Sequence, residues 1–284
     1  MTQQRVLITG AAGRLGSAVF KHLAENNFDV VGVDKVPSSR LENRNRPPHF
    51  YCLDLTDFSS CANFIHGFDA VVHFANWPHA SANHPNVVLG DNLKMNANIF
   101  GMAIEIGVRK VIFSSSIQVV TGIGMYKDAP PLPEYLPLDD EYLARPGNHY
   151  ALSKRLTELM LSNLCERQAD LQAMSLRFPV LISRHYPWKR KDLSGPAGSE
   201  AYSMLQAADA AKLTELLLNA DWAGHKIAIP ADKTPTCGVH VQELLAADLA
   251  GIPVKSPSLT ALTHSEILQS LGWVQPQTSW DSIL

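Results

Sequence analysis

The chain has 284 residues, a formal net charge of −3 and hydrophobic side chains at 46% of its positions. That size and apolar content suffice for one large domain, or for one domain that carries a smaller lobe. The near-neutral charge argues against electrostatic binding of nucleic acid or of an anionic membrane surface.

The cysteines and histidines indicate which redox compartment the chain suits and whether a metal site is expected. The four cysteines are scattered and form no C-x-x-C pair, so we expect neither a disulfide framework nor a zinc ribbon, but a reducing cytoplasm. The histidines lack the spacing of a metal site, so no catalytic metal is expected. We also expect no signal peptide, and no apolar run approaches the roughly 20 residues that span a bilayer.

Short apolar runs alternate with segments of helical spacing along most of the chain. Such alternation implies crossover connections between parallel strands. We therefore expect an α/β fold, a Rossmann-type doubly wound parallel sheet with a small C-terminal α/β substrate lobe. Strands are predicted over 5–9, 30–33, 70–74, 110–114, 174–178 and 226–229, and helices over 15–26 and 92–107. The predicted domains are a dinucleotide-binding domain over 1–180, to which 205–232 returns, and a lobe over 181–204 and 233–284.

Two stretches are expected to be irregular. Residues 126–147 are rich in proline and acidic side chains and are predicted to form a long loop, which in compact domains is often functional. The stretch 184–191 carries five basic side chains beside Tyr186 and Trp188. It is either a solvated basic loop or a binding site for a carboxylate or diphosphate.

Glycines at 10, 13 and 16 lie directly between the first strand and the first helix. In that context Gly10 permits a tight turn, Gly13 lets the backbone approach a pyrophosphate, and Gly16 lets the helix pack on the sheet. The helix N-terminus then offers free N–H groups to the phosphates. The alternative is a purely structural turn, but the strand–turn–helix context favours a dinucleotide site.

Asp34 follows the second strand, where a carboxylate accepts hydrogen bonds from the adenosine ribose and repels a 2′-phosphate. This favours NAD over NADP, although Lys35 beside it weakens the discrimination. The other reading of Asp34 is an ordinary turn residue.

Tyr150 and Lys154 are four residues apart, so on a helix they lie on one face. A free tyrosine, with a pKa of about 10, is a poor base at neutral pH, but an adjacent ammonium and an oxidised nicotinamide favour the phenolate. Tyr150 is then able to take a proton from a substrate hydroxyl while hydride leaves the same carbon.

Three serines, 114 to 116, end the strand that precedes this helix. In doubly wound sheets ligands bind outside the carboxyl ends of the strands, where hydroxyl groups donate to a reacting oxygen. A polar strand terminus is the bland alternative. Together with the upstream glycines and the downstream Tyr/Lys pair, the serines favour a catalytic site.

With these motifs the chain resembles an extended short-chain dehydrogenase/reductase of the NAD-dependent epimerase/dehydratase family. The resemblance is dense over residues 5–180 and thin afterwards. It rests on 9–16, Asp34, 53–55, 73–76, Asn92, Asn98, 113–116, 150–154 and 177–179.

The resemblance implies roles for individual residues. Ser116, Tyr150 and Lys154 would be catalytic. The cofactor, NAD, would be bound by Gly10, Ala12, Gly13, Arg14, Leu15, Gly16, Asp34, Lys35, Asp54, Leu55, Phe74, Ala75, Asn76, Asn92, Ser114, Tyr150, Lys154, Pro179 and Val180. Substrate would meet Trp77, His79, Ser116, Gln118, Tyr150 and Arg184.

The expected activity is hydride transfer at a hydroxyl of a sugar or nucleotide sugar, by an epimerase or a dehydrogenase. Uronate dehydrogenation with NADH release is an alternative, and a catalytically silent NAD(P)-sensing regulator is a second. Ile117 and Gln118 stand where sugar-nucleotide dehydratases carry an Asp-Glu pair, so dehydration is not expected. The resemblance also suggests a homodimer that pairs the Tyr150 helix and the helix before it. Leu152, Leu156, Leu159 and Met160 extend the apolar positions of the Tyr150 helix and serve either that contact or the core.

Overall fold

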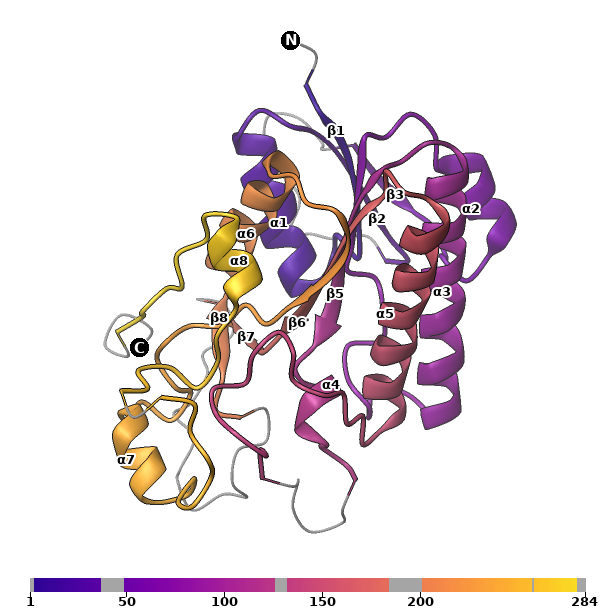
Figure 1. Cartoon of the computed structure of the whole chain (residues 1–284). Coiled ribbons are helices and arrows are strands. Elements are labelled where there is room, and N and C mark those ends of the chain that lie inside the picture. The colour runs from indigo at the N-terminus through magenta and orange to yellow at the C-terminus, as the bar shows by residue number, and fades with distance from the viewer. Residues whose placement is uncertain (1–2, 37–48, 126–131, 184–200, 257, 280–284) are drawn as a thin grey trace.

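The computed structural model describes residues 3–36, 49–125, 132–183, 201–256 and 258–279. Its centre is a seven-stranded sheet in which every neighbouring pair is parallel, in the order β3-β2-β1-β4-β5-β6-β9 (Figure 1). The strands are β1 (Arg5–Thr9), β2 (Asp29–Asp34), β3 (His49–Cys52), β4 (Ala70–His73), β5 (Lys110–Ser116), β6 (Gln172–Phe178) and β9 (Gly224–Ala228). The predicted doubly wound sheet is thereby confirmed. Chain order reverses between β1 and β4, and such a switch point opens a crevice at the carboxyl ends of the strands.

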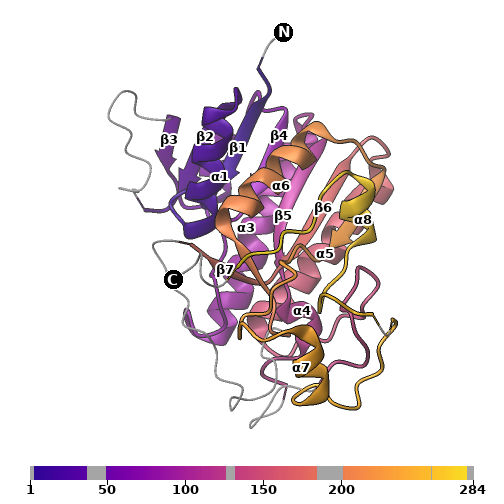
Figure 2. The ribbon, with the colours of Figure 1, turned by 90° about the vertical axis from the view of Figure 1, so that its left-hand side faces the viewer.

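Helices cover both faces of the sheet (Figures 1 and 2). One face carries α1 (Arg14–Glu25), α6 (Ala207–Asn219) and α8 (Glu266–Ser270), and the other carries α2 (Phe58–Phe64), α3 (Pro85–Glu105) and α5 (His149–Arg167). Each face has its own apolar core, because the strands are buried on both sides and the helices turn one apolar stripe inward. Among the described residues, no helix has the length and apolar character that crossing a bilayer requires.

A smaller lobe lies beyond the carboxyl ends of the strands (Figure 1). It contains α4 (Gln118–Thr121), α7 (Val241–Ala246) and a separate parallel pair, β7 (Val180–Ile182) with β8 (Met204–Gln206). A third apolar cluster, which includes Leu136, Leu138 and Leu244, forms its core.

Long-range contacts join segments on either side of the predicted domain boundary at residue 180. Leu136 and Leu138, expected in a loop of the larger domain, join the core of the lobe, and their N–H groups donate to Pro253 and Leu262 carbonyls at 2.9 Å. Conversely, Leu268 of α8, which was expected in the lobe, packs into the core between the main sheet and helices α1 and α6. Two isolated leucines among prolines carry too little periodicity to indicate such a contact, since the partner is more than 100 residues away.

A buried ion pair joins α5 to the main sheet. Arg177 of β6 donates to both carboxylate oxygens of Glu158 on α5, at 2.9 and 3.0 Å, and the Ser115 hydroxyl of β5 donates at 2.7 Å. Burial alone would raise the pKa of Glu158, but these hydrogen bonds and the guanidinium charge hold it below its usual value. Because α5 carries Tyr150 and Lys154, this pair also fixes the position of those two side chains relative to the sheet.

We predict that Glu158→Gln lowers the free energy of unfolding by about 3 kcal/mol, because it leaves the Arg177 charge buried without its counter-charge. Urea unfolding measures the loss. The matched control is Glu166→Gln on the exposed side of the same helix, for which we expect a change within about 0.5 kcal/mol. The Glu158 contribution is present at neutral pH and disappears as pH falls through its lowered pKa. Equal stability of the two variants would contradict the assignment.

Candidate active site

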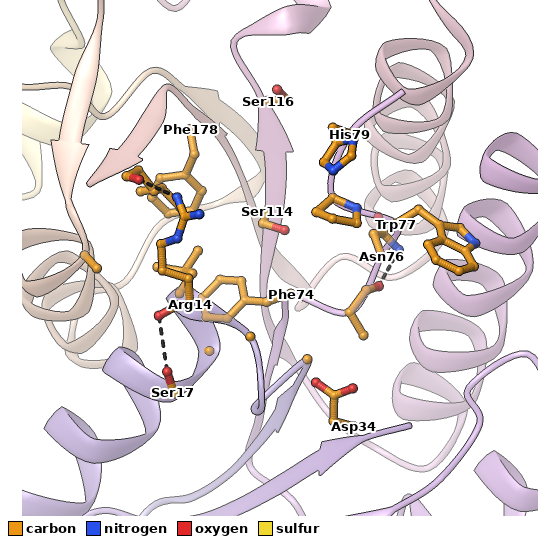
Figure 3. Close-up of a pocket in the computed structure, with 18 of the residues that line it drawn as sticks. Arg14, Ser17, Asp34, Phe74, Asn76, Trp77, His79, Ser114, Ser116 and Phe178 are labelled. Carbon is orange, nitrogen blue, oxygen red and sulfur yellow. Dashed lines mark hydrogen bonds between the residues drawn. The ribbon is translucent and has the colours of Figure 1, made fainter. Parts of the chain in front are cut away.

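A cleft of about 1290 Å³ opens at the carboxyl ends of the central strands (Figure 3). Figure 3 shows Ser114 and Ser116 along β5, with Asn76 and Trp77 from the segment after β4 on one side and Arg14 of α1 on the other. The cleft therefore lies across the point where the strand order reverses, as expected for a ligand site in a doubly wound sheet.

The glycine-rich turn forms one wall of the cleft. Gly10 has a φ of +67°, and a Cβ there would lie 2.6 Å from the Ala75 nitrogen. A Cβ on Gly16 would lie 2.1 Å from the Gly10 carbonyl oxygen, so both positions exclude any side chain. Gly13 directly precedes α1, which leaves the first N–H groups of that helix facing the cleft.

Asp34 marks the far end of the same wall. Its carboxylate accepts a hydrogen bond from the Ala12 N–H at 3.0 Å and lines the cleft. The Lys35 ammonium lies 3.8 Å from the centroid of the Trp77 ring, and both residues line the cleft. The Trp77 indole donates to Asp91 at 2.9 Å. Asp54 also lines the cleft, and hydrogen bonds from Thr56 hold the pKa of its carboxyl below the usual value.

This wall fits an extended dinucleotide such as NAD. The side-chain-free turn and the helix N-terminus suit a pyrophosphate, and Asp34 suits ribose hydroxyls. Apolar Leu53 and Leu55 stand beside Asp54, where a flat base would lie. The cofactor, when bound, would supply hydride acceptance at the opposite end, beside β5 and α5.

Ser116, Tyr150 and Lys154 all line the cleft. Ser116 is the last residue of β5, and its hydroxyl accepts the Gln118 N–H at 3.2 Å, which leaves its own O–H able to donate. Tyr150 lies in the first turn of α5 and Lys154 one turn later. The Lys154 ammonium is 5.5 Å from the centroid of the Tyr150 ring, close enough to favour negative charge on the phenol.

Lys154 is buried, with 2% of its surface exposed. Its ammonium donates to the Ser114 carbonyl and to the Asn76 amide oxygen, each at 2.7 Å. Burial lowers the pKa of Lys154 to about 7, while the Glu158 carboxylate opposes the shift. The ammonium is therefore the dominant form below about pH 7 and is lost above it.

The start of α5 is held by Asn148 and Gln118. The Asn148 side chain accepts the Ala151 N–H at 2.8 Å, which caps the helix, and donates to the Ile123 carbonyl at 2.8 Å. It also donates to the Gln118 amide oxygen at 3.3 Å. These bonds connect α4 to α5 and fix where Tyr150 enters the cleft.

Most of the residues expected at the site line this one cleft, on walls contributed by distant parts of the chain. They are Gly10, Gly13, Arg14, Leu15, Gly16, Asp34, Lys35, Asp54, Leu55, Phe74, Ala75, Asn76, Trp77, His79, Ser114, Ser116, Gln118, Tyr150, Lys154, Pro179 and Val180.

Three expected residues differ from that set. The Ala12 N–H donates to the Asp34 carboxylate. Asn92 accepts the Trp77 N–H at 2.7 Å and donates to Ser153. Both residues therefore contact lining residues and do not line the cleft themselves. Arg184 and the basic stretch after it lie outside the described residues. Within the described part of the chain, no group of three or more metal-binding side chains is arranged to hold an ion.

Sequence reasoning missed several lining residues. Ser17 and Lys21 follow Gly13 at helical spacing, so helix periodicity was able to find them. Asn148 does not line the cleft but caps α5, a role that capping rules were able to find. Leu53, Ser115 and Phe178 lie within segments that the motifs already marked, although no role was assigned to them. The other lining residues without an expected role are Ala18, Pro78, Met95, Leu181, Ser183 and Ala207.

We predict that Gly16→Ala weakens NAD binding about tenfold or more, because relieving its contact with Gly10 costs about 1–3 kcal/mol and displaces the turn. Tryptophan fluorescence titration with NAD measures the loss. Gly101→Ala on α3 is the matched control, since a Cβ there meets nothing within 4 Å and leaves binding unchanged. Equal affinities for the two variants would show that the turn does not bind the cofactor.

Comparison with known proteins agrees with this geometry. A model of the "NAD dependent epimerase/dehydratase family" matches residues 6–216. The chain is 31% identical over 192 residues to an NAD-dependent glucose-6-phosphate dehydrogenase of Haloferax volcanii, a match covering 65% of this chain and 71% of that one. It is 29% identical over 197 residues to a putative UDP-glucose 4-epimerase of Methanocaldococcus jannaschii, covering 68% and 59% respectively.

A solved structure shares the fold. The glucuronic acid dehydrogenase of Chromohalobacter salexigens superposes with a TM-score of 0.70 at 22% identity, over 99% of this chain and 89% of that one. The family match covers the glycine-rich turn, the serines and the Tyr/Lys helix, and the family description confirms the expected NAD dependence. The chain belongs to the NAD-dependent epimerase/dehydratase family.

Proposed function

We propose that this chain is an NAD-dependent oxidoreductase that acts on a hydroxyl group of a sugar or nucleotide sugar. The observation that carries the proposal is the meeting of Ser116, Tyr150 and Lys154 in the same cleft as the glycine-rich turn. A hydroxyl donor, a phenol and a buried ammonium are the groups that oxidation of an alcohol requires beside a nicotinamide.

Each residue of the cleft has a separate role in the proposed reaction. The glycine-rich turn and Asp34 would hold NAD, which would supply the acceptor for the hydride of the carbinol carbon. Tyr150 removes the proton of the substrate hydroxyl, and Ser116 donates a hydrogen bond to the same oxygen as its charge changes. Lys154 favours the phenolate through its charge and would donate to the ribose beside the nicotinamide. Gln118 and His79 also line the cleft and would contact other hydroxyl groups of the substrate.

Two outcomes of hydride removal fit this site. A dehydrogenase releases NADH and the oxidised sugar, whereas an epimerase returns the hydride to the opposite face. The relatives named above are of both kinds by name. Elimination of water is disfavoured, because Ile117 points into the core of the small lobe and Gln118 is neutral, so no carboxylate follows Ser116.

A catalytically silent NAD(P)-sensing regulator is the alternative from another class. It has no physical need for a buried lysine whose pKa lies near 7, because burying that ammonium costs stability. Retention of all three catalytic side chains therefore favours the enzyme.

We predict that Tyr150→Phe lowers kcat about 10²- to 10⁴-fold on any accepted substrate and retains NAD binding, because it removes one oxygen and keeps the ring. Wild type and variant are compared on sugars, uronates and sugar nucleotides by NADH absorbance and by chromatography of isomers. Net NADH identifies a dehydrogenase, and an isomer without net NADH identifies an epimerase.

Tyr135→Phe is the control for this experiment. Tyr135 also loses a hydrogen-bonded hydroxyl, which donates to Asp139 at 2.9 Å, but it lies in the small lobe away from the cleft. We expect Tyr135→Phe to keep wild-type rates. A wild type that binds NAD and never exceeds Tyr150→Phe on any substrate would favour the regulator.

We further propose a homodimer that pairs the outer faces of α3 and α5, in a reducing cytoplasmic setting that suits four free cysteines. Leu156 and Leu159 of α5 are 37% and 49% exposed, and Val87 of the adjacent α3 and Ile106, which follows that helix, are also exposed. Met160 instead packs toward the core.

We predict that Leu159→Glu converts the dimer to a monomer, because a charge at the centre of the interface loses its solvation. Light scattering at micromolar concentration measures the mass. Leu143→Glu, at a leucine that is 72% exposed and lies off α5, should leave the dimer intact. A wild type that scatters as a monomer would refute the pairing.

A further inference from the structure

We propose that Asn76 is a positioning residue for Lys154, and that a buried chain of Thr9, His73 and Asn96 fixes the orientation of its amide. The inference rests on the proposed role of Lys154 and adds a specific acceptor for its ammonium. Asn76 lines the cleft, and the sequence predicted only a contact with the dinucleotide for it.

The Lys154 ammonium has three N–H donors. The Ser114 carbonyl takes one, and its position is set by the β5 backbone. The Asn76 Oδ1 takes a second at 2.7 Å. Within the described residues these bonds leave the third donor for the cofactor ribose. The direction of that donor thus depends on where the Asn76 side chain stands.

The Asn76 amide is held in one of its two orientations. Its Nδ2 donates to the Asn96 Oδ1 at 2.7 Å and to the Ala75 carbonyl. A flipped amide would place an NH₂ group against the ammonium and an oxygen against the Asn96 oxygen. Both contacts would be donor against donor or acceptor against acceptor, so the flip is disfavoured.

Asn96 is itself fixed by its neighbours. Its Nδ2 donates to the Thr157 hydroxyl at 2.7 Å, so its Oδ1 faces Asn76 and His73. His73 is fully buried, and burial lowers its pKa to about 3, so the ring is neutral. Its Nε2 contacts the Asn96 Oδ1 at 2.7 Å and is therefore the N–H donor. Its Nδ1 then accepts the Thr9 hydroxyl at 2.6 Å.

A single assignment of donors and acceptors thus satisfies the whole chain from β1 to Lys154. Thr9 donates to His73, His73 donates to Asn96, and Asn96 accepts from Asn76, whose oxygen accepts from Lys154. Because every link is buried or half-buried, breaking one leaves a polar group unsatisfied.

The charged groups around Lys154 explain why its ammonium depends on the Asn76 oxygen. Glu158 lies one turn along α5, but its carboxylate is already shared by Arg177 and Arg155. His73 on β4 is neutral, and the Tyr150 phenol stands on the cleft side. The Asn76 dipole therefore supports the ammonium at a site where burial opposes it.

The test is the pKa of Lys154, measured by NMR titration of lysine labelled with ¹³C at the ε carbon. The protein is used without substrate or cofactor, and the signal is assigned by its absence in Lys154→Arg. We expect a wild-type value of about 7, far from exposed lysines at about 10.4. Asn76→Ala should lower it by about one unit, and Asn76→Asp should raise it by about one unit or more.

Two further variants complete the design. Asn96→Ala should shift the pKa of Lys154 in the same direction as Asn76→Ala but by less, because it frees the amide to rotate. Asn98→Ala on the same helix loses one bond to the Leu55 carbonyl, remote from Lys154, and should leave that pKa unchanged.

An unchanged pKa of Lys154 in Asn76→Ala, or a shift that Asn98→Ala reproduces, would overturn the proposal. An unchanged pKa in Asn96→Ala would overturn the part played by the buried chain. Should circular dichroism show Asn76→Ala unfolded, Asn76→Asp decides, and a pKa at or below the wild-type value refutes the inference. Since no turnover is measured, failure here is distinct from failure to find a sugar substrate.

Discussion

The chemistry of the cleft depends on keeping the Lys154 ammonium between the end of β5 and the segment after β4. A lysine with 2% of its surface exposed loses most of its hydration, so the fold must supply oxygens in place of water. The Ser114 carbonyl and the Asn76 amide do so at 2.7 Å. They are in reach because Glu158 and Arg177 hold α5 against β5 and β6.

The dinucleotide end of the cleft follows from a different constraint, the close approach of backbone to backbone in the glycine-rich turn. Gly16 stacks the start of α1 on the Gly10 carbonyl, and Gly10 itself lies against the start of the segment after β4. That same segment carries Asn76 and Trp77, so the turn that suits a pyrophosphate also positions the segment that contacts Lys154. The glycine-rich turn and the asparagine that contacts Lys154 are therefore joined by one short stretch of backbone.

Local patterns predicted the parts of the molecule whose physics is local. The β1 turn, the i, i+4 pair on α5 and the serines at the end of β5 depend on spacing within a few residues, and the structure brings them to one cleft. The predicted strands also match the observed ones to within two residues. The attachment of Leu136 and Leu138 to the small lobe depends on contacts across more than 100 residues and left no periodic signal. The same holds for His73 and Asn96, whose hydrogen bonds only the folded sheet brings together.

The most direct test of the central claim is a crystal structure of this protein with NAD bound. We predict that the adenosine ribose lies on Asp34, the pyrophosphate over Gly13 and the nicotinamide between Tyr150 and the Pro179–Val180 segment, with the nicotinamide ribose within hydrogen-bonding reach of Lys154. A nicotinamide turned away from Tyr150, or a dinucleotide bound elsewhere with the cleft left open, would contradict it.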